Sequence, residues 1–96
     1  MNNSTYRTIN AGTSSIGTSA AQINSNSIEV KREVTVLASS GNIGSVYIGS
    51  SSVSTSGTNE GFALKPDMGT SLNIDNINKI YAISQTADNR LHWLIT

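Results

Sequence analysis

Short runs of alternating apolar and polar residues constrain the fold of this chain more than any other feature of its sequence. The longest run is SIEVKREVTVLASS, residues 27–40, whose alternate positions are apolar except at Arg32. The apolar positions are Ile28, Val30, Val34, Val36 and Ala38. Successive side chains of a strand point to opposite faces, so this period of two predicts a strand buried on one face. A helix is the alternative, because Glu29 and Glu33 would lie one turn apart, but four β-branched residues and Thr35 favour a strand.

Further short strands are expected between turn residues in the rest of the chain. They span residues 46–49, 61–64, 70–75, 79–84 and 91–96. The SGNIGS segment, residues 40–45, supplies glycines for a turn, and we expect it to close a hairpin. Pro66 cannot donate to a ladder and ends a strand, while residues 50–61 form a surface loop. Short strands, frequent turns and no helical periodicity predict an all-β fold, either a single antiparallel β-sandwich or a jelly-roll-like barrel.

The inward-facing apolar positions of these strands define the expected core. They are Val34, Val36, Val46, Ile48, Phe62, Leu64, Leu72, Ile74, Ile80 and Trp93. Trp93 is assigned to the core because it alternates in phase with Leu91 and Ile95. A chain of 96 residues has the length of one domain with one modest core.

Residues 1–27 differ from the rest, and we expect them to form an extended polar N-terminal arm ahead of a β-sandwich domain at residues 28–96. Large apolar side chains are widely spaced in this segment, so it contributes little to a core by itself. Two interpretations stay open: a flexible tail with one weak strand, or an arm that becomes ordered only against a neighbouring subunit. In the second interpretation Tyr6, Ile9 and Ile16 contact the partner.

Charge and composition exclude several classes of partner. Six basic and six acidic residues cancel, and charged residues make up 12% of the chain, about half the usual share, so no surface for nucleic acid or anionic lipid is expected. No apolar segment is long enough to span a membrane, so we expect a soluble protein made in the cytoplasm. Without cysteine there is no disulfide or thiolate site. Ser, Thr and Asn account for 37 of the 96 residues, a polar but uncharged surface that suits an assembly component.

Few side chains are suited to chemistry. His92 is the single histidine, and a Ser-His-Asp hydrolase would need it beside a serine and an aspartate, but its position between Leu91 and Trp93 favours the outer face of a strand. One histidine and scattered carboxylates do not supply the convergent ligands that zinc requires. Calcium could use Asp75 and its neighbours in NIDNIN, which are also ordinary turn residues. We therefore predict no enzymatic activity, no metal and no cofactor.

Three aromatic residues raise the possibility of carbohydrate recognition. Trp93, Tyr47 and Tyr81 would build a stacking platform for a sugar ring if they shared one exposed face. The alternation on the last strand instead places Trp93 in the core or at a subunit interface. The packing role is favoured, and the sugar platform remains the alternative.

The segment from Gly44 to Thr96 resembles small structural proteins of tailed-bacteriophage virions. The likeness follows the strand VYIG, the serine-rich loop after it, the strand GFAL, the turn and strand PDMGTSL, the strand KIYAIS and the aromatic C-terminal strand. The residues that carry it are Val46, Tyr47, Ile48, Gly49, Gly61, Phe62, Leu64, Pro66, Leu72, Ile80, Tyr81 and Ala82. These positions belong to the scaffold, so the resemblance implies a fold and a setting but no active site.

The resemblance implies a non-enzymatic capsid decoration, or cement, protein that binds and stabilises the outer surface of the assembled capsid. Its expected partners are the major capsid protein and further copies of itself, with a homotrimer as the expected assembly. It would be made in the host cytoplasm and located on the virion. The alternatives are a carbohydrate- or receptor-binding β-module of a fibre or tail, a head fibre, and a tail component that contacts other virion proteins.

Overall fold

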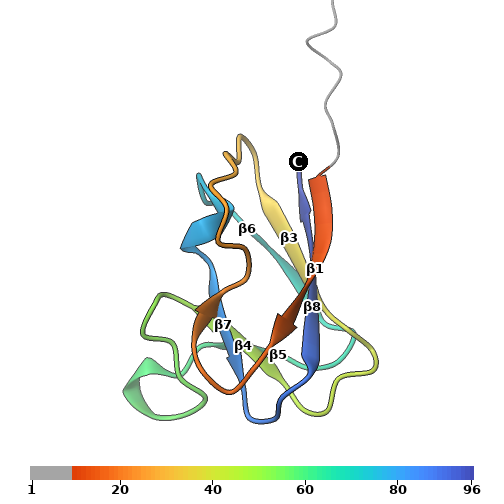
Figure 1. Ribbon diagram of the computed structural model, residues 1–96, viewed down its shortest axis with the longest axis vertical. Coiled ribbons are helices and arrows are strands. Elements are labelled where there is room, and N and C mark those ends of the chain that lie inside the picture. The colour runs from red at the N-terminus through yellow and green to blue at the C-terminus, as the bar shows by residue number, and fades with distance from the viewer. Residues whose placement is uncertain (1–9) are drawn as a thin grey trace, which may run out of the picture.

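The computed structural model describes residues 10–96, which form a β-sandwich of two antiparallel four-stranded sheets (Figure 1). The first sheet has the order β1-β8-β3-β6, with β1 at Asn10–Ile16, β8 at Asn89–Ile95, β3 at Val34–Ala38 and β6 at Gly69–Leu72. The second has the order β2-β7-β4-β5, with β2 at Ala21–Gln22, β7 at Tyr81–Ser84, β4 at Val46–Gly49 and β5 at Phe62–Leu64. The predicted all-β sandwich is confirmed.

Two single-turn 3-10 helices interrupt the loops, η1 at Gly57–Asn59 and η2 at Ile77–Lys79. The amide oxygen of Asn76 accepts a hydrogen bond from the N–H of Asn78 and so caps η2. Within residues 10–96 no helix has the length and apolar character needed to cross a membrane.

The core lies between the two sheets and agrees with the predicted set in all but one position. Val34, Val36, Val46, Ile48, Leu64 and Ile80 are buried, and Leu72, Ile74 and Trp93 pack against them while keeping part of their surface exposed. Phe62 is the exception, because 59% of it is exposed. Leu91 and Ile77 also belong to the core and are fully buried.

The N-terminal segment is part of the sandwich from residue 10 onward, which corrects the expected boundary at residue 27 and the polar arm over residues 10–27. β1 pairs with β8 along its whole length, from Asn10 opposite Ile95 to Ile16 opposite Asn89. Ile16 and Ile23 are each 4% exposed and belong to the core. Ile16 therefore cannot anchor a partner as proposed. Tyr6 and Ile9 lie outside the described residues.

The sequence pattern concealed β1 because small polar residues occupy its inward positions. Gly12 and Ser14 precede Ile16 on the inner face, so only one position of that face is a large apolar residue. The hydroxyl of Ser14 donates a hydrogen bond to the carbonyl of Ile23, which removes the cost of turning a polar group inward.

The long strand expected at residues 28–38 is shorter than predicted. The chain bends at Lys31 and Arg32, and the regular strand β3 begins only at Val34. An unbroken strand would have turned Arg32 toward the core, whereas the bend leaves it exposed. Val30 stays buried, and its N–H donates to the carbonyl of Asp75 at 2.9 Å.

The expected hairpin after β3 is also wrong, because residues 39–45 cross from the first sheet to the second. Two asparagine side chains hold this crossing against the start of β8. Asn42 accepts from the N–H of Arg90 at 2.7 Å and donates to its carbonyl at 2.8 Å. The buried Asn89 does the same for Ile43, at 2.8 and 2.9 Å. Hydrogen bonds from these two side-chain amides thus hold the segment in place, without the backbone ladder of a hairpin.

Candidate functional site

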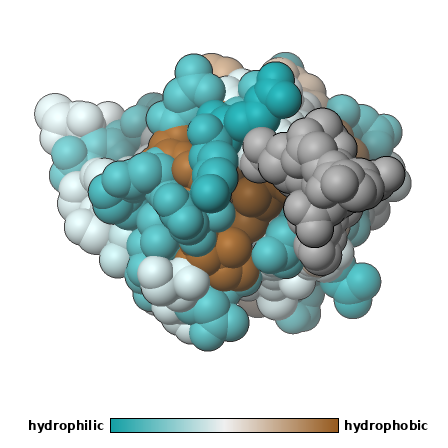
Figure 2. All heavy atoms as spheres, turned by 90° about the horizontal axis from the view of Figure 1, so that it is seen from above, coloured by the Kyte–Doolittle hydropathy of each residue, from teal (hydrophilic) through white to brown (hydrophobic). Residues whose placement is uncertain are grey.

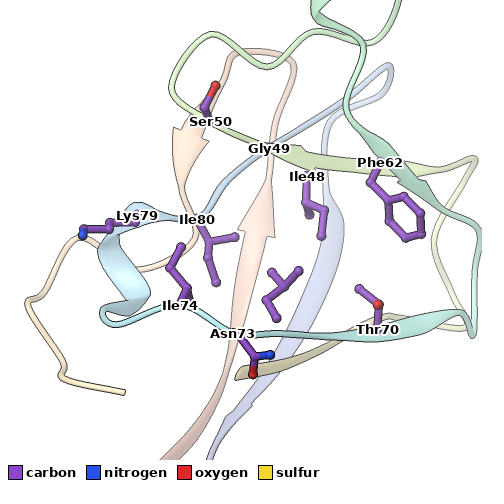
Figure 3. A pocket seen from close by; sticks show the side chains of 10 residues that line it. Ile48, Gly49, Ser50, Phe62, Thr70, Asn73, Ile74, Lys79 and Ile80 are labelled. Carbon is purple, nitrogen blue, oxygen red and sulfur yellow. The ribbon is translucent and has the colours of Figure 1, made fainter. Parts of the chain in front are cut away.

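An apolar groove of about 560 Å³ lies at the side of the sandwich where β5 and β6 form the edges (Figure 3). In the close-up, Ile48, Phe62, Ile74 and Ile80 point toward one another across it, while the ammonium end of Lys79 points away. The residues that line it are Ile48, Gly49, Ser50, Phe62, Thr70, Leu72, Asn73, Ile74, Lys79 and Ile80. We call this feature the β5–β6 groove.

The exposure of Phe62 follows from its place at the sheet edge and not from its direction. Phe62 pairs with Ile48 and Leu64 with Val46, so both side chains lie on the inner face as the alternation predicts. Leu64 is fully buried, but β5 and β6 are edge strands and Phe62 lies at the open side between the sheets. The predicted core residue is therefore an exposed aromatic wall of the groove.

The serine-rich loop is folded back beside the mouth of the groove. Val53, which is 5% exposed, packs against Gly49 and Gly61. A Cβ built on Gly61 would lie 2.5 Å from Cγ2 of Val53 and 2.6 Å from the carbonyl oxygen of Ile48, so this approach requires glycine. The loop borders a smaller hollow of about 220 Å³ that shares Ile48 and Phe62 with the groove.

The rim carries one ion pair, in which Lys79 Nζ lies 2.8 Å from a carboxylate oxygen of Asp75. The hydrogen bond and charge of Lys79 lower the pKa of Asp75 below its ordinary value of 3.8. The amide oxygen of Asn76 accepts from the N–H groups of Ile28 and Asn78, both at 3.1 Å. The oxygen of Asn76 thus holds the loop and caps η2, and the carboxylate of Asp75 pairs with Lys79. These are the ordinary turn roles that were the alternative to calcium binding. Within residues 10–96 no three His, Cys, Asp or Glu side chains gather in a metal-binding arrangement.

One residue of the groove, Leu72, lies toward the end of the sandwich at which the described chain begins. Val34 pairs with Leu72 on one side and with Ile95 on the other, and Ile95 pairs with Asn10, so Leu72 lies in the same row as the first described residue. Figure 2 looks onto this end and shows apolar surface enclosed by hydrophilic side chains.

The opposite side of the sandwich, where β1 and β2 form the edges, is closed. The indole of Trp93 lies across Gly12, where an added Cβ would come within 2.6 Å of Cζ2. Its Nε1 donates to the hydroxyl of Ser14 at 3.2 Å. The N–H of Ser84 on β7 donates to the carbonyl of Gly17 at 2.9 Å, which joins the second sheet to the segment after β1.

The other residues considered from sequence do not come together. His92 lies on the outer face of the first sheet, as predicted, and its Nδ1 is hydrogen-bonded to the hydroxyl of Thr13 at 2.8 Å. Tyr47 and Tyr81 lie on the outer face of the second sheet, on the neighbouring strands β4 and β7. Trp93 is on the inner face of the first sheet, so the three aromatic residues do not build one platform.

Five of the groove residues were predicted as core positions, but the groove itself was not predicted. The groove lies between two short edge strands, the three-residue β5 and the four-residue β6, and the sequence alone does not show that these strands lie at the edges. Comparison with known proteins found no matching family model, no matching curated protein and no matching solved structure.

Proposed function

We propose that this chain is a non-enzymatic structural protein of a tailed-phage virion, a decoration protein that binds the outer surface of the assembled capsid. The observation that carries the proposal is the β5–β6 groove with its exposed Phe62. Five apolar side chains converge there, and the hydroxyls of Ser50 and Thr70 have no histidine or carboxylate among the other lining residues. Such a lining supports binding of apolar side chains of a protein partner rather than acid–base or nucleophilic chemistry.

The proposed partner is the major capsid protein, which would insert an apolar side chain between Phe62 and Ile74. Covering the exposed part of the Phe62 ring contributes about 1–2 kcal/mol to the binding free energy of each copy. The chain has no net charge and only 12% charged residues, which lets many copies lie close together without strong mutual repulsion. Because binding is complete only on the mature lattice, each copy stabilises that lattice against the internal pressure of the packaged DNA.

The test is a phage particle whose genome carries this gene with an affinity tag after Thr96. We expect the tagged chain in DNA-filled heads separated from tails on a density gradient, accessible to external protease. Particles from which the gene is deleted should release their DNA at a lower temperature than tagged or untagged particles. Recovery of the chain only with tails or fibres, or its absence from particles, would contradict the proposal.

A carbohydrate-binding module of a fibre is the second candidate, and one observation favours it. Tyr47 pairs with Ile83 and Tyr81 pairs with Gly49, so the two phenol rings are diagonal neighbours on one partly exposed face. This candidate predicts saccharide binding that is lost in Tyr81→Ala and retained in Phe62→Ser. The capsid candidate predicts the reverse dependence, with particle binding lost in Phe62→Ser and retained in Tyr81→Ala.

A further inference from the structure

β1 is an edge strand with none of the usual protection against pairing. Its sequence NAGTSSI contains no charge and no proline, and its seven residues pair with β8 in one unbroken register without a bulge. The other three edges are shorter, with two residues in β2, three in β5 and four in β6. Natural sheets shorten, charge or bend their edges because an exposed row of backbone groups pairs with other chains.

The register shows which backbone groups of β1 face outward. Thr96 N–H donates to the carbonyl of Glu33, and Ser39 N–H donates to the carbonyl of Arg90, so even-numbered residues of β8 direct their backbone groups toward β3. Odd-numbered residues of β8 therefore face β1, where their partners are Asn10, Gly12, Ser14 and Ile16. By the same alternation, Ala11, Thr13 and Ser15 direct their N–H and C=O groups away from the sheet. No other strand of the described residues pairs with that side of β1.

We propose that β1 pairs in antiparallel fashion with β1 of a second copy of this chain, in a two-fold register centred on Thr13. Thr13 then faces Thr13 of the second copy, and Ala11 faces Ser15 at both ends. Each outward N–H meets an outward C=O, so three residues from each copy make six hydrogen bonds. The two first sheets become one continuous sheet of eight strands.

The sequence of β1 is compatible with a second copy, because a two-fold contact places Thr13 opposite Thr13 and small residues opposite small residues on either side of it. No charge on β1 meets a like charge, and opposed threonines form a favourable cross-strand pair. On the inner face Gly12 lies opposite Ser14, so no bulky side chain obstructs the approach. The indole of Trp93 lies across Gly12 and remains partly exposed, so the second copy would cover its open edge.

This inference is independent of the capsid-binding proposal, because it uses the side of the sandwich opposite the β5–β6 groove. It also differs from the homotrimer expected from the resemblance. A two-fold pairing occupies the β1 edge of both copies, so no third copy can pair there and the assembly is a dimer. A trimer through this edge would leave unpaired backbone groups. The expected mass of the assembly is therefore twice the 10.1 kDa of the chain.

The first experiment measures mass by light scattering over protein concentrations from about 1 µM to about 1 mM, a range suited to a small strand-pairing interface. We expect the mass to rise from one chain to two. Thr13→Lys should abolish the rise by opposing two like charges at the axis. Thr13→Val, which removes the bond to His92 but keeps the pairing edge, should retain it, and so should Ser71→Lys on the exposed β6 edge.

The second experiment uses the lack of natural cysteine in the chain. Opposed residues of a hydrogen-bonded antiparallel pair lie about 5.5 Å apart at Cα, within the range of a disulfide. Thr13→Cys should therefore cross-link to a dimer under mild oxidation at least about tenfold faster than Ser71→Cys, which is also exposed, on β6. Equal rates for the two variants, a mass of three chains, or a single-chain mass at every concentration would overturn the proposal.

Discussion

The two sides of the sandwich differ in how the space between the sheets is filled at the edge strands. At the β1–β2 side, Trp93 on the neighbouring strand β8 lies over Gly12 and is bonded to Ser14, which fills the space between the sheets. At the β5–β6 side, Phe62 is itself at the edge and faces the short side chain of Thr70, and the interior stays open. An aromatic residue one strand inside an edge closes the sandwich, whereas one on the edge leaves a groove.

The largest expected difference is between the two aromatic residues. Trp93→Ala removes an indole that packs against the core, and we expect it to lower the free energy of unfolding by about 2–4 kcal/mol. Phe62→Ala removes a mostly exposed ring and should cost less than about 1 kcal/mol. Urea denaturation followed by circular dichroism measures both. Equal losses would show that the two sides do not differ as described.

A smaller effect is expected at the glycine beneath the indole. Gly12→Ala introduces a Cβ that would lie 2.6 Å from Trp93 Cζ2, so the indole must move, at a cost of about 1–3 kcal/mol. The matched control is Gly17→Ala, where an added Cβ meets nothing within 4 Å. Denaturation should separate the variants, and only Gly12→Ala should shift Trp93 fluorescence to longer wavelength. A Gly12→Ala protein with wild-type stability and fluorescence would contradict the described closure.

The smallest effect is expected at the rim of the groove. Lys79 lowers the pKa of Asp75 in the folded chain, so the ion pair favours folding most above the ordinary pKa of 3.8, and this contribution is lost as the pH falls through the lower folded value. Asp75→Asn should therefore leave the melting temperature nearly unchanged at pH 3 and reduce it slightly at neutral pH. Thermal melts of both proteins across this range provide the measurement. A larger difference in melting temperature between the two proteins at acid pH than at neutral pH would contradict the lowered pKa of Asp75.

The sequence was sufficient for the fold class and for most of the core, because alternation over β3, β4 and β8 marks buried faces directly. It was insufficient where the type of a residue does not indicate whether its side chain points into the core. One interpretation of residues 1–27 included a weak strand, but the place of β1 in the sandwich was not predicted because Gly12 and Ser14 occupy inward positions. The crossing at residues 39–45 depends on hydrogen bonds between the side chain of Asn42 and Arg90 and between that of Asn89 and Ile43. No local pattern encodes such long-range pairing.

The β5–β6 groove is a second feature that the sequence alone did not predict. Alternation correctly directed Phe62 inward, but exposure depends on whether a further strand lies beside β5, which only the sheet order reveals. The N-terminal contribution to the core has a similar origin, because the buried Ile16 pairs with Asn89 on β8 and the buried Ile23 donates its N–H to the carbonyl of Ile80, next to β7.

We propose that the open side of the sandwich binds the capsid, and the number of copies bound to particles that lack the gene measures this most directly. Wild-type protein is compared with Phe62→Ser and with Ile43→Ser, which alters an apolar side chain that is 73% exposed and outside the groove lining. With all three equally stable, we predict that Phe62→Ser weakens binding by about tenfold, which is 1.4 kcal/mol, while Ile43→Ser binds as wild type does. Undiminished binding of Phe62→Ser, or an equal loss in both variants, would contradict the account.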